Sequence, residues 1–303
     1  MNNKVSSLSN LLHQQVEDMK SGKQAENPIW TRYSALDRRI NGFCLGEFVV
    51  VGGRPAMGKT QLLINLALNI SKNHPVLFIT NEDSEQLITQ RFLSSISDIP
   101  RYILRMGRLD DEEKQKLILQ SETFANYHLY INETPCLSVE EFKTLCINQI
   151  KEKNIQVIMI DNLQALHSET CKYTERSSEL EYITKELRRT AQEQQICLIA
   201  TSQLNRNVEH RRGLYNKKPV LSDLKDCGSI EEEADKIIFI HRPEYYGFVK
   251  DECGNSLENV VELLISKNRN GETNEVRFLK TKDFTNFVEP ETLSLNFDNK
   301  QNE

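Results

Sequence analysis

Residues 53–60 form the feature that most restricts how this chain can fold. They read Gly-Arg-Pro-Ala-Met-Gly-Lys-Thr, which fits G-x-x-x-x-G-K-[ST], and they lie between an apolar run at 48–51 and a helical pattern at 59–71. In such a loop the glycines let backbone N–H groups surround phosphate oxygens, and the N-terminus of the following helix adds positive potential. The sequence therefore predicts a strand, a phosphate-binding loop and a helix in succession.

Each residue of this loop has an expected role in binding a nucleotide. Lys59 is expected to reach the terminal phosphates, and Thr60 to bind Mg²⁺ through its hydroxyl group. The alternative is a glycine turn that carries a lysine by chance, but the strand before it and the helix after it favour nucleotide binding. The predicted contacts are Gly53, Arg54, Pro55, Ala56, Met57, Gly58, Lys59 and Thr60.

The apolar pattern along the rest of the chain predicts an α/β fold. Runs typical of strands cover residues 48–51, 76–80, 128–131, 157–160, 197–201, 237–241 and 260–265, and helical patterns cover 59–71, 84–96, 110–125, 139–151 and 177–194. Runs such as VIMI and ICLIA are apolar on both faces, as in central parallel strands covered by helices. Residues beyond 275 are typical of antiparallel edge strands. We expect one doubly wound domain at 27–290, a helix and polar linker at 1–26, and a polar tail at 291–303.

Three polar residues that follow predicted strands are candidates for the chemistry. Asp161 ends the run VIMID, where a carboxylate could bind Mg²⁺ near the loop; the alternative is a helix N-cap. Glu82 follows the run FIT and could orient an attacking water, or it could be a solvated loop acid. Gln203 ends ICLIATSQ and could sense the γ-phosphate, or it could lie on the surface.

Two cations follow the predicted strand VVELLIS. Lys267 and Arg269 have only Glu272 as a local acid in the sequence. They could act on a phosphate group as an arginine finger with a companion lysine. From the residues alone, solvated charge is the favoured interpretation.

Residues 6–20 predict a short helix with one apolar face. The apolar residues recur at spacings of three and four, at Leu8, Leu11, Leu12, Val16 and Met19. This face could pack on its own domain or on a neighbouring subunit. The sequence slightly favours the first arrangement.

The charge of the chain limits what it can bind over its whole surface. Thirty-eight basic and 44 acidic residues among 303 give a net charge of −6, which excludes a domain coated with basic charge for bulk nucleic-acid binding. Any phosphate contact must be local. The N-terminus lacks the apolar core of a signal peptide, and no stretch approaches the ~18 apolar residues of a membrane span. We expect a cytoplasmic protein with no membrane contact.

Several segments together resemble the C-terminal ATPase domain of the DnaB-type replicative helicases, a hexameric branch of the RecA-like fold of P-loop NTPases. GRPAMGKT resembles the phosphate loop of that family, and VIMIDNLQ its Mg²⁺-binding strand. NED, TSQLNR and SKNRNG resemble its strand-end glutamate, its phosphate-sensing segment and its trans-acting cations. The resemblance covers roughly residues 8–289. A mostly parallel, twisted sheet flanked by helices is thereby implied, with antiparallel strands at the C-terminal edge.

The resemblance implies a role for each polar residue named above. Glu82 would be the catalytic base, and Asp161 with Thr60 would bind Mg²⁺. Gln203 would sense the phosphate, while Lys267 and Arg269 would act on the nucleotide of a neighbouring subunit.

The resemblance also implies where the base and the DNA bind. The family stacks adenine between an arginine and an aromatic residue, here Arg242 and Phe287, with Phe284 nearby. DLKDCGSIEEEAD is similar to the DNA-contacting loop and helix, and the basic stretch NRNVEHRRGLYNKKP suits a grip on single-stranded DNA, although it could also be a solvated loop. In the DNA-contacting loop, Lys225 stands where the family usually has arginine. A lysine keeps the charge but loses the bidentate fork of a guanidinium. The expected DNA contacts are Arg206, Arg211, Arg212, Lys225, Asp226 and Gly228.

As a whole, the resemblance implies a homo-hexamer that uses ATP and Mg²⁺ to move along single-stranded DNA and unwind it, in chromosomal or mobile-element replication. The family has an N-terminal helical domain that recruits primase. This chain has only the predicted helix before Trp30, which leaves a primase contact without its usual domain. Two other functions stay open: a RecA-like accessory ATPase that does not separate strands, and a non-catalytic ATP-binding partner of a full-length helicase ring.

Overall fold

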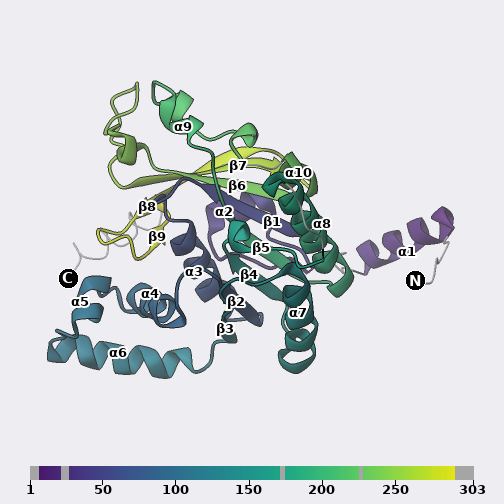
Figure 1. Cartoon of the computed structure of the whole chain (residues 1–303), viewed down its shortest axis with the longest axis horizontal. Coiled ribbons are helices and arrows are strands. Elements are labelled where there is room, and N and C mark those ends of the chain that lie inside the picture. Colours follow the sequence, from purple (N-terminus) through teal and green to yellow (C-terminus); the bar gives the residue numbers. More distant parts are fainter. Residues whose placement is uncertain (1–6, 22–26, 171–174, 225–227, 291–303) are drawn as a thin grey trace.

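The computed structural model describes residues 7–21, 27–170, 175–224 and 228–290, so the predicted tail at 291–303 lies outside it. A nine-stranded sheet forms its centre, with helices on both faces (Figure 1). The strands are β1 (Phe48–Gly53), β2 (Val76–Thr80), β3 (Leu129–Glu133), β4 (Val157–Asp161), β5 (Cys197–Gln203), β6 (Lys236–His241), β7 (Val260–Asn268), β8 (Asn274–Lys280) and β9 (Phe287–Val288).

The helices alternate with the first six strands along the chain. They are α1 (Leu8–Lys20), α2 (Ser34–Ile40), α3 (Lys59–Ile70), α4 (Glu85–Ser97), α5 (Arg101–Met106), α6 (Asp111–Phe124), α7 (Val139–Lys153), α8 (Arg176–Gln194), α9 (Asn207–His210) and α10 (Gly228–Glu233). The sequence does not predict α2 and α5, whose seven and six residues are too few to produce a clear apolar period.

The strand order in the sheet is β3-β2-β4-β5-β1-β6-β7-β8-β9. Neighbouring strands from β3 to β6 pair in parallel, and β7, β8 and β9 continue the sheet with antiparallel pairing. The predicted fold class, with its antiparallel C-terminal strands, is therefore confirmed.

Alternating side chains of β1 enter two separate cores, one on each face of the sheet. Val49 and Val51 pack with residues of α2, α3 and α4, whereas Phe48 and Val50 pack with residues of α7 and α8. Because both faces are covered, the central strands β1 and β4 are buried along their whole length. This arrangement fixes the ends of β1, β4 and β5, where the candidate site lies.

Helix α1 does not pack on the domain that follows it, which corrects the arrangement that the sequence slightly favours. Its apolar side chains remain between 46% and 71% exposed, and none of its residues is buried. Figure 1 shows α1 extending from one side of the body. Within the described residues, no helix combines the length and the apolar character that crossing a membrane requires.

Candidate nucleotide site

The loop predicted to bind phosphate connects the carboxyl end of β1 to the start of α3. Two of its glycines are required by close contacts. A Cβ atom on Gly53 would lie 2.6 Å from Ile240 Cγ2, and one on Gly58, whose φ is +104°, would lie 2.3 Å from Phe284 Cζ. The loop therefore has a backbone path that other residue types would disturb.

The side chain of Lys59 folds back over this loop. Its Nζ donates hydrogen bonds of 2.9 Å to the Gly53 carbonyl and 3.2 Å to the Arg54 carbonyl. Burial lowers the pKa of Lys59, while the charges of Asp161 and Glu82 oppose that shift. The ammonium group thus lies within electrostatic reach of both acids that the sequence singles out.

Asp161 is the last residue of β4 and pairs in register with Thr80 of β2. It is 8% exposed, and its Oδ1 accepts a hydrogen bond from the Thr201 hydroxyl of β5. The following segment is held by Asn81, whose side chain bonds the backbone N–H and C=O of Asn162 at 2.6 and 2.9 Å. Asn81 is not among the residues predicted from the sequence. It could have been found as a polar residue that lies directly between a buried strand and Glu82.

Glu82 and Gln203 lie at the same edge of the sheet as Asp161. Glu82 is exposed just after β2, and Gln203 pairs in register with Gly53. The backbone of Gln203 is held by Gln164, whose side chain accepts from its N–H at 3.1 Å and donates to Ser202 Oγ at 2.9 Å. The carboxyl ends of β1, β2, β4 and β5 thus bring the predicted polar residues together, as ligand sites in open α/β sheets require.

Other side chains of the loop point away from this cluster. Arg54 is 7% exposed, and it donates to Glu209 at 2.8 Å through Nε and to the Leu204 carbonyl at 2.7 Å through Nη1. Met57 is buried in the core, whereas Pro55 and Ala56 are exposed. Arg54 and Met57 therefore hold the loop in place through their side chains, and the Met57 N–H also donates to the Arg54 carbonyl at 3.3 Å.

The predicted partner of Arg242 has to be corrected. Its guanidinium lies 4.6 Å from the ring centre of Phe284, and its Nη1 donates to the Ala56 carbonyl at 3.0 Å. Phe287 is only 4% exposed and packs in the core, with its ring edge-on to Phe278 and Phe284. Phe284 is thus the aromatic residue beside Arg242 at the loop, and the ring of Phe287 packs against the ring of Phe284.

Lys267 and Arg269 lie at the opposite edge of the sheet. Asn268, between them, pairs with Lys236 at the amino end of β6, because β7 runs antiparallel to β6. Glu272 is the only acid near them in the sequence, but the fold brings a distant one: Arg269 Nε lies 3.5 Å from Asp235 Oδ1. These cations therefore lie at the edge opposite the phosphate loop of their own chain.

The basic stretch after β5 is largely occupied by contacts within the chain. Arg211 forms an ion pair with the buried Asp223, and Lys218 lies 3.0 Å from Glu262. Lys217 donates to the Glu209 carbonyl and lies over the ring of Tyr246. Among the described residues, the exposed side chains of Arg206 and Arg212 have no such partner. Lys225 and Asp226 lie outside the described residues, and Gly228 begins α10.

The sequence matches the family described as "DnaB-like helicase C terminal domain" over residues 28–289. It is 33% identical over 275 residues to the replicative DNA helicase DnaB of Geobacillus stearothermophilus, and 33% identical over 276 residues to the replicative DNA helicase DnaC of Bacillus subtilis (strain 168). These matches use 90% of this chain but 58% and 59% of the relatives. The chain thus spans somewhat more than half the length of the curated relatives it matches.

Two solved structures have the same fold. One is described as an ATPase domain, and it aligns with a TM-score of 0.84 and 28% identity, covering 94% of this chain and 99% of that one. The other is titled "The Structure Of A DnaB-Like Replicative Helicase And Its Interactions With Primase", and it aligns with a TM-score of 0.81 and 29% identity, covering 94% of this chain and 67% of that one.

Proposed function

Because the chain belongs to the family of DnaB-like helicase C-terminal domains, we propose that it is an ATP-driven motor that moves along single-stranded DNA and unwinds DNA during chromosomal or mobile-element replication. The observation that carries this proposal is the convergence of Lys59, Asp161 and Glu82 at one edge of the sheet. A phosphate loop with two acids at adjacent strand ends is the arrangement that phosphoryl transfer to water needs.

The residues at this edge fit a nucleotide with Mg²⁺. The carboxylate of Asp161 and the hydroxyl of Thr60 are hard oxygen donors of the kind that Mg²⁺ prefers, and the metal would neutralise charge on the β- and γ-phosphates. Lys59 would release its contacts with the loop carbonyls and turn its ammonium group to the phosphates. Exposed Glu82 would orient the attacking water and accept its proton. Arg242 and Phe284 would flank the adenine.

The positions of the trans-acting cations favour a ring of head-to-tail subunits. Arg269 lies at the opposite edge of the sheet from Gly53, so it can reach a phosphate only if a second copy presents its loop. Contacts between two different faces of identical subunits generate rings when the rotation closes. A homo-hexamer is the closed form that we propose.

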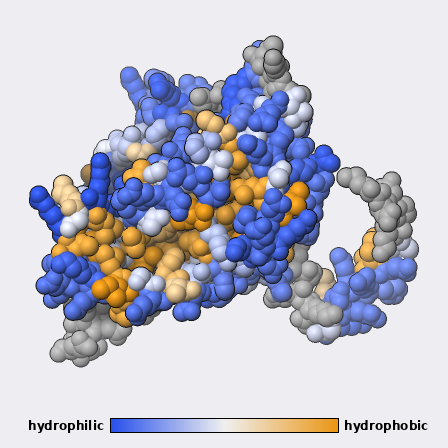
Figure 2. All heavy atoms as spheres, turned by 60° about the horizontal axis from the view of Figure 1, so that its bottom comes forward, coloured by the Kyte–Doolittle hydropathy of each residue, from blue (hydrophilic) through white to orange (hydrophobic). Residues whose placement is uncertain are grey.

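Helix α1 offers a second head-to-tail contact. Its apolar side chains are exposed, and Figure 1 shows it on the opposite side of the molecule from α4, α5 and α6. There, α4, α6 and edge strand β3 enclose an apolar groove of about 360 Å³, and Figure 2 shows hydrophobic side chains gathered on this face. The groove residues include Phe92, Leu93, Ile96, Leu117, Phe124 and Ile131. We propose that α1 of one subunit occupies this groove in the next.

The α1 contact is tested by paired substitutions on opposite faces of the helix. Leu12→Ser with Val16→Ser removes apolar surface, so the oligomer is expected to shift toward monomers in sizing chromatography with light scattering. Gln14→Ser with Glu17→Ser is the matched control, which should keep the wild-type mass. An unchanged mass in both double variants would reject the docking of α1.

Single-stranded DNA would be held locally, because the net charge is −6. We assign this contact to exposed Arg206 and Arg212 together with the segment from Lys225 to Gly228, which includes Asp226. Arg54 bonds Glu209 and the Leu204 carbonyl, so the phosphate loop is linked to the start of the basic stretch. Changes at the nucleotide could reach the DNA contact by this route, with Gln203 as the phosphate sensor beside it.

An ATPase assay run beside a fork-unwinding assay tests the proposed function. A helicase should hydrolyse ATP and separate the strands. Hydrolysis without unwinding would identify the accessory ATPase, and the absence of both would identify the non-catalytic partner.

A further inference from the structure

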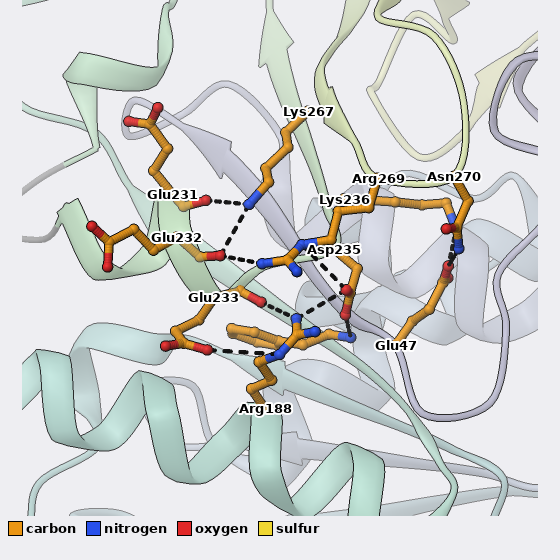
Figure 3. Close-up of polar contacts among 11 residues, drawn as sticks. Glu47, Arg188, Glu231, Glu232, Glu233, Asp235, Lys236, Lys267, Arg269 and Asn270 are labelled. Carbon is orange, nitrogen blue, oxygen red and sulfur yellow. Dashed lines mark hydrogen bonds and ion pairs between the residues drawn. The ribbon is translucent and has the colours of Figure 1, made fainter. Parts of the chain in front are cut away.

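Asp235, which directly precedes β6, is the centre of a charged network at the edge of the sheet opposite the nucleotide site (Figure 3). Its side chain is 11% exposed. Oδ1 lies 2.9 Å from Arg188 Nη1 and 3.5 Å from Arg269 Nε, and Oδ2 accepts a hydrogen bond of 2.9 Å from the Phe48 N–H. Both oxygens of this carboxylate are therefore engaged, and one of them faces the trans-acting arginine.

The backbone fixes Asp235 against both β1 and Arg269. The Asp235 N–H donates to the Phe48 carbonyl at 2.8 Å, and the Arg269 N–H donates to the Asp235 carbonyl at 2.9 Å. The next residue, Lys236, forms a buried ion pair with Glu47, which precedes β1. Asp235 thus links the backbone of Arg269 to β1, the strand that precedes the phosphate loop.

The guanidinium of Arg269 is held on one side and open on the other. Besides the contact of Nε with Asp235, Nη2 donates to the Glu232 carbonyl at the end of α10. Within the described residues, Nη1 has no partner, and the side chain is 43% exposed. Figure 3 shows the Glu231 and Glu232 carboxylates pointing away from the cations, so Asp235 supplies the carboxylate that Arg269 contacts. Since a guanidinium is a rigid planar fork, holding Nε and Nη2 also fixes the direction of Nη1.

We propose that Asp235 is a positioning residue for Arg269: it holds the guanidinium so that the Nη1 edge faces the nucleotide of the neighbouring subunit. Asp235 does not itself touch that nucleotide. The inference rests on the proposed trans action of Arg269. Donors fixed before the reaction stabilise developing charge without reorganising, so loss of the anchor should slow turnover more than it weakens nucleotide binding.

The first test is Asp235→Asn, which keeps the size of the side chain and removes its charge. We expect kcat for ATP hydrolysis to fall by about 10- to 100-fold, with KM for ATP and the affinity for a fluorescent ATP analogue within about twofold of wild type. Glu181→Gln on α8 is the matched control, because it removes the charge of an exposed ion pair with Lys185. This control should keep the wild-type kcat.

The second test asks which half of the interface Asp235 serves, by mixing Asp235→Asn with each of two inactive variants under conditions of proven subunit exchange. Lys59→Ala has an intact arginine, and Arg269→Ala has an intact phosphate loop. If Asp235 acts through Arg269, Asp235→Asn regains turnover when mixed with Lys59→Ala and none when mixed with Arg269→Ala. A purely structural effect on the loop of its own subunit would reverse this pattern.

The results separate this proposal from the one on which it rests. Restoration with Arg269→Ala, or an Asp235→Asn protein that fails to assemble or to bind the analogue normally, would overturn the positioning role. Failure of Lys59→Ala mixed with Arg269→Ala would instead reject the trans action of Arg269 itself.

Discussion

The sheet has one edge at the carboxyl end of β1 and another at its amino end, and the two are built in different ways. At the carboxyl edge, Lys59 comes from one continuous loop, and its charge lies within electrostatic reach of Asp161 and Glu82, which lie at the ends of the adjacent strands β4 and β2. At the amino edge, Arg269 is fixed by Asp235 and by the end of α10, which are distant in sequence from the nucleotide loop. Short local motifs at several strand ends thus mark the residues of the first edge, whereas contacts between distant segments define the second.

If the proposed function holds, neither edge forms a complete hydrolytic site within one chain. In the proposed function, the carboxyl edge would supply the lysine and the acids for phosphate, metal and water, and the amino edge would supply Lys267 and Arg269 to the neighbouring subunit. Substitutions at the two edges should therefore differ in whether they remove nucleotide binding, turnover or the pairing between subunits.

The largest effect is expected at the carboxyl edge. Lys59→Ala should abolish both nucleotide binding and turnover, since it removes the cation that we propose contacts the phosphates. Glu82→Gln should keep nucleotide affinity while kcat falls by about 10²- to 10⁴-fold, because only the proton acceptor is lost. Both are measured by ATPase assays and nucleotide titration.

The control for Lys59→Ala is Lys72→Ala, which removes an exposed lysine that follows α3 and lies over the Tyr127 ring. It should bind and hydrolyse ATP as wild type does. Wild-type turnover by Glu82→Gln would reject its assignment as the base.

A smaller effect should separate the two neighbouring arginines of the basic stretch. Arg212→Ala should weaken single-stranded DNA binding several-fold and reduce the slope of log affinity against log salt by about 0.7, the value for one phosphate contact. Arg211→Ala should lower the free energy of unfolding by about 2 kcal/mol, because it leaves the buried Asp223 without its ion-pair partner. DNA titrations at several salt concentrations and urea unfolding measure these quantities. Equal DNA affinity and salt slope in wild type and Arg212→Ala would place the DNA contact elsewhere.

The smallest effect concerns pH and His241, at the carboxyl end of β6. Burial, together with the charge of Lys218, lowers the pKa of His241 from 6.5 to about 4. The unfolded chain therefore takes up a proton at a pH where the folded chain does not, so this contribution to stability is complete above pH 6.5 and is lost as the pH falls toward 4. We expect the loss between about pH 7 and about pH 5.5 to be about 1 kcal/mol.

Urea unfolding at several pH values measures this contribution as the difference between wild type and His241→Gln. His210→Gln is the matched control, because His210 is exposed on α9. If His241→Gln keeps the same pH dependence as wild type, His241 is not the group that titrates.

Residues with a local signal could be predicted from the sequence, and residues defined by distant contacts could not. The positions of the loop 53–60 and of Asp161 at the ends of β1 and β4 could be predicted because each lies directly beside a recognisable buried strand. The prediction that Phe287 lies beside Arg242 was wrong. Phe284 and Phe287 are three residues apart, and only the fold decides which ring faces the loop.

Charge pairing was the least predictable property. Arg211 pairs with Asp223, 12 residues away, and Arg269 pairs with Asp235, 34 residues away. In the sequence these arginines therefore looked like unpaired cations, whereas the fold gives each an acidic partner. The apolar face of α1 was visible as a period of three to four residues, but its exposure depends on the direction in which the helix leaves the domain.

The central claim is that opposite edges of two neighbouring sheets complete one ATPase site, and mixed rings test it most directly. Purified Lys59→Ala and Arg269→Ala are combined, subunit exchange is verified with labelled subunits, and the ATPase rate is measured across mixing ratios. We predict that a fraction of the wild-type rate returns and is largest near equal proportions, since some interfaces then pair an intact loop with an intact arginine. Proven exchange with no activity at any ratio would contradict the account.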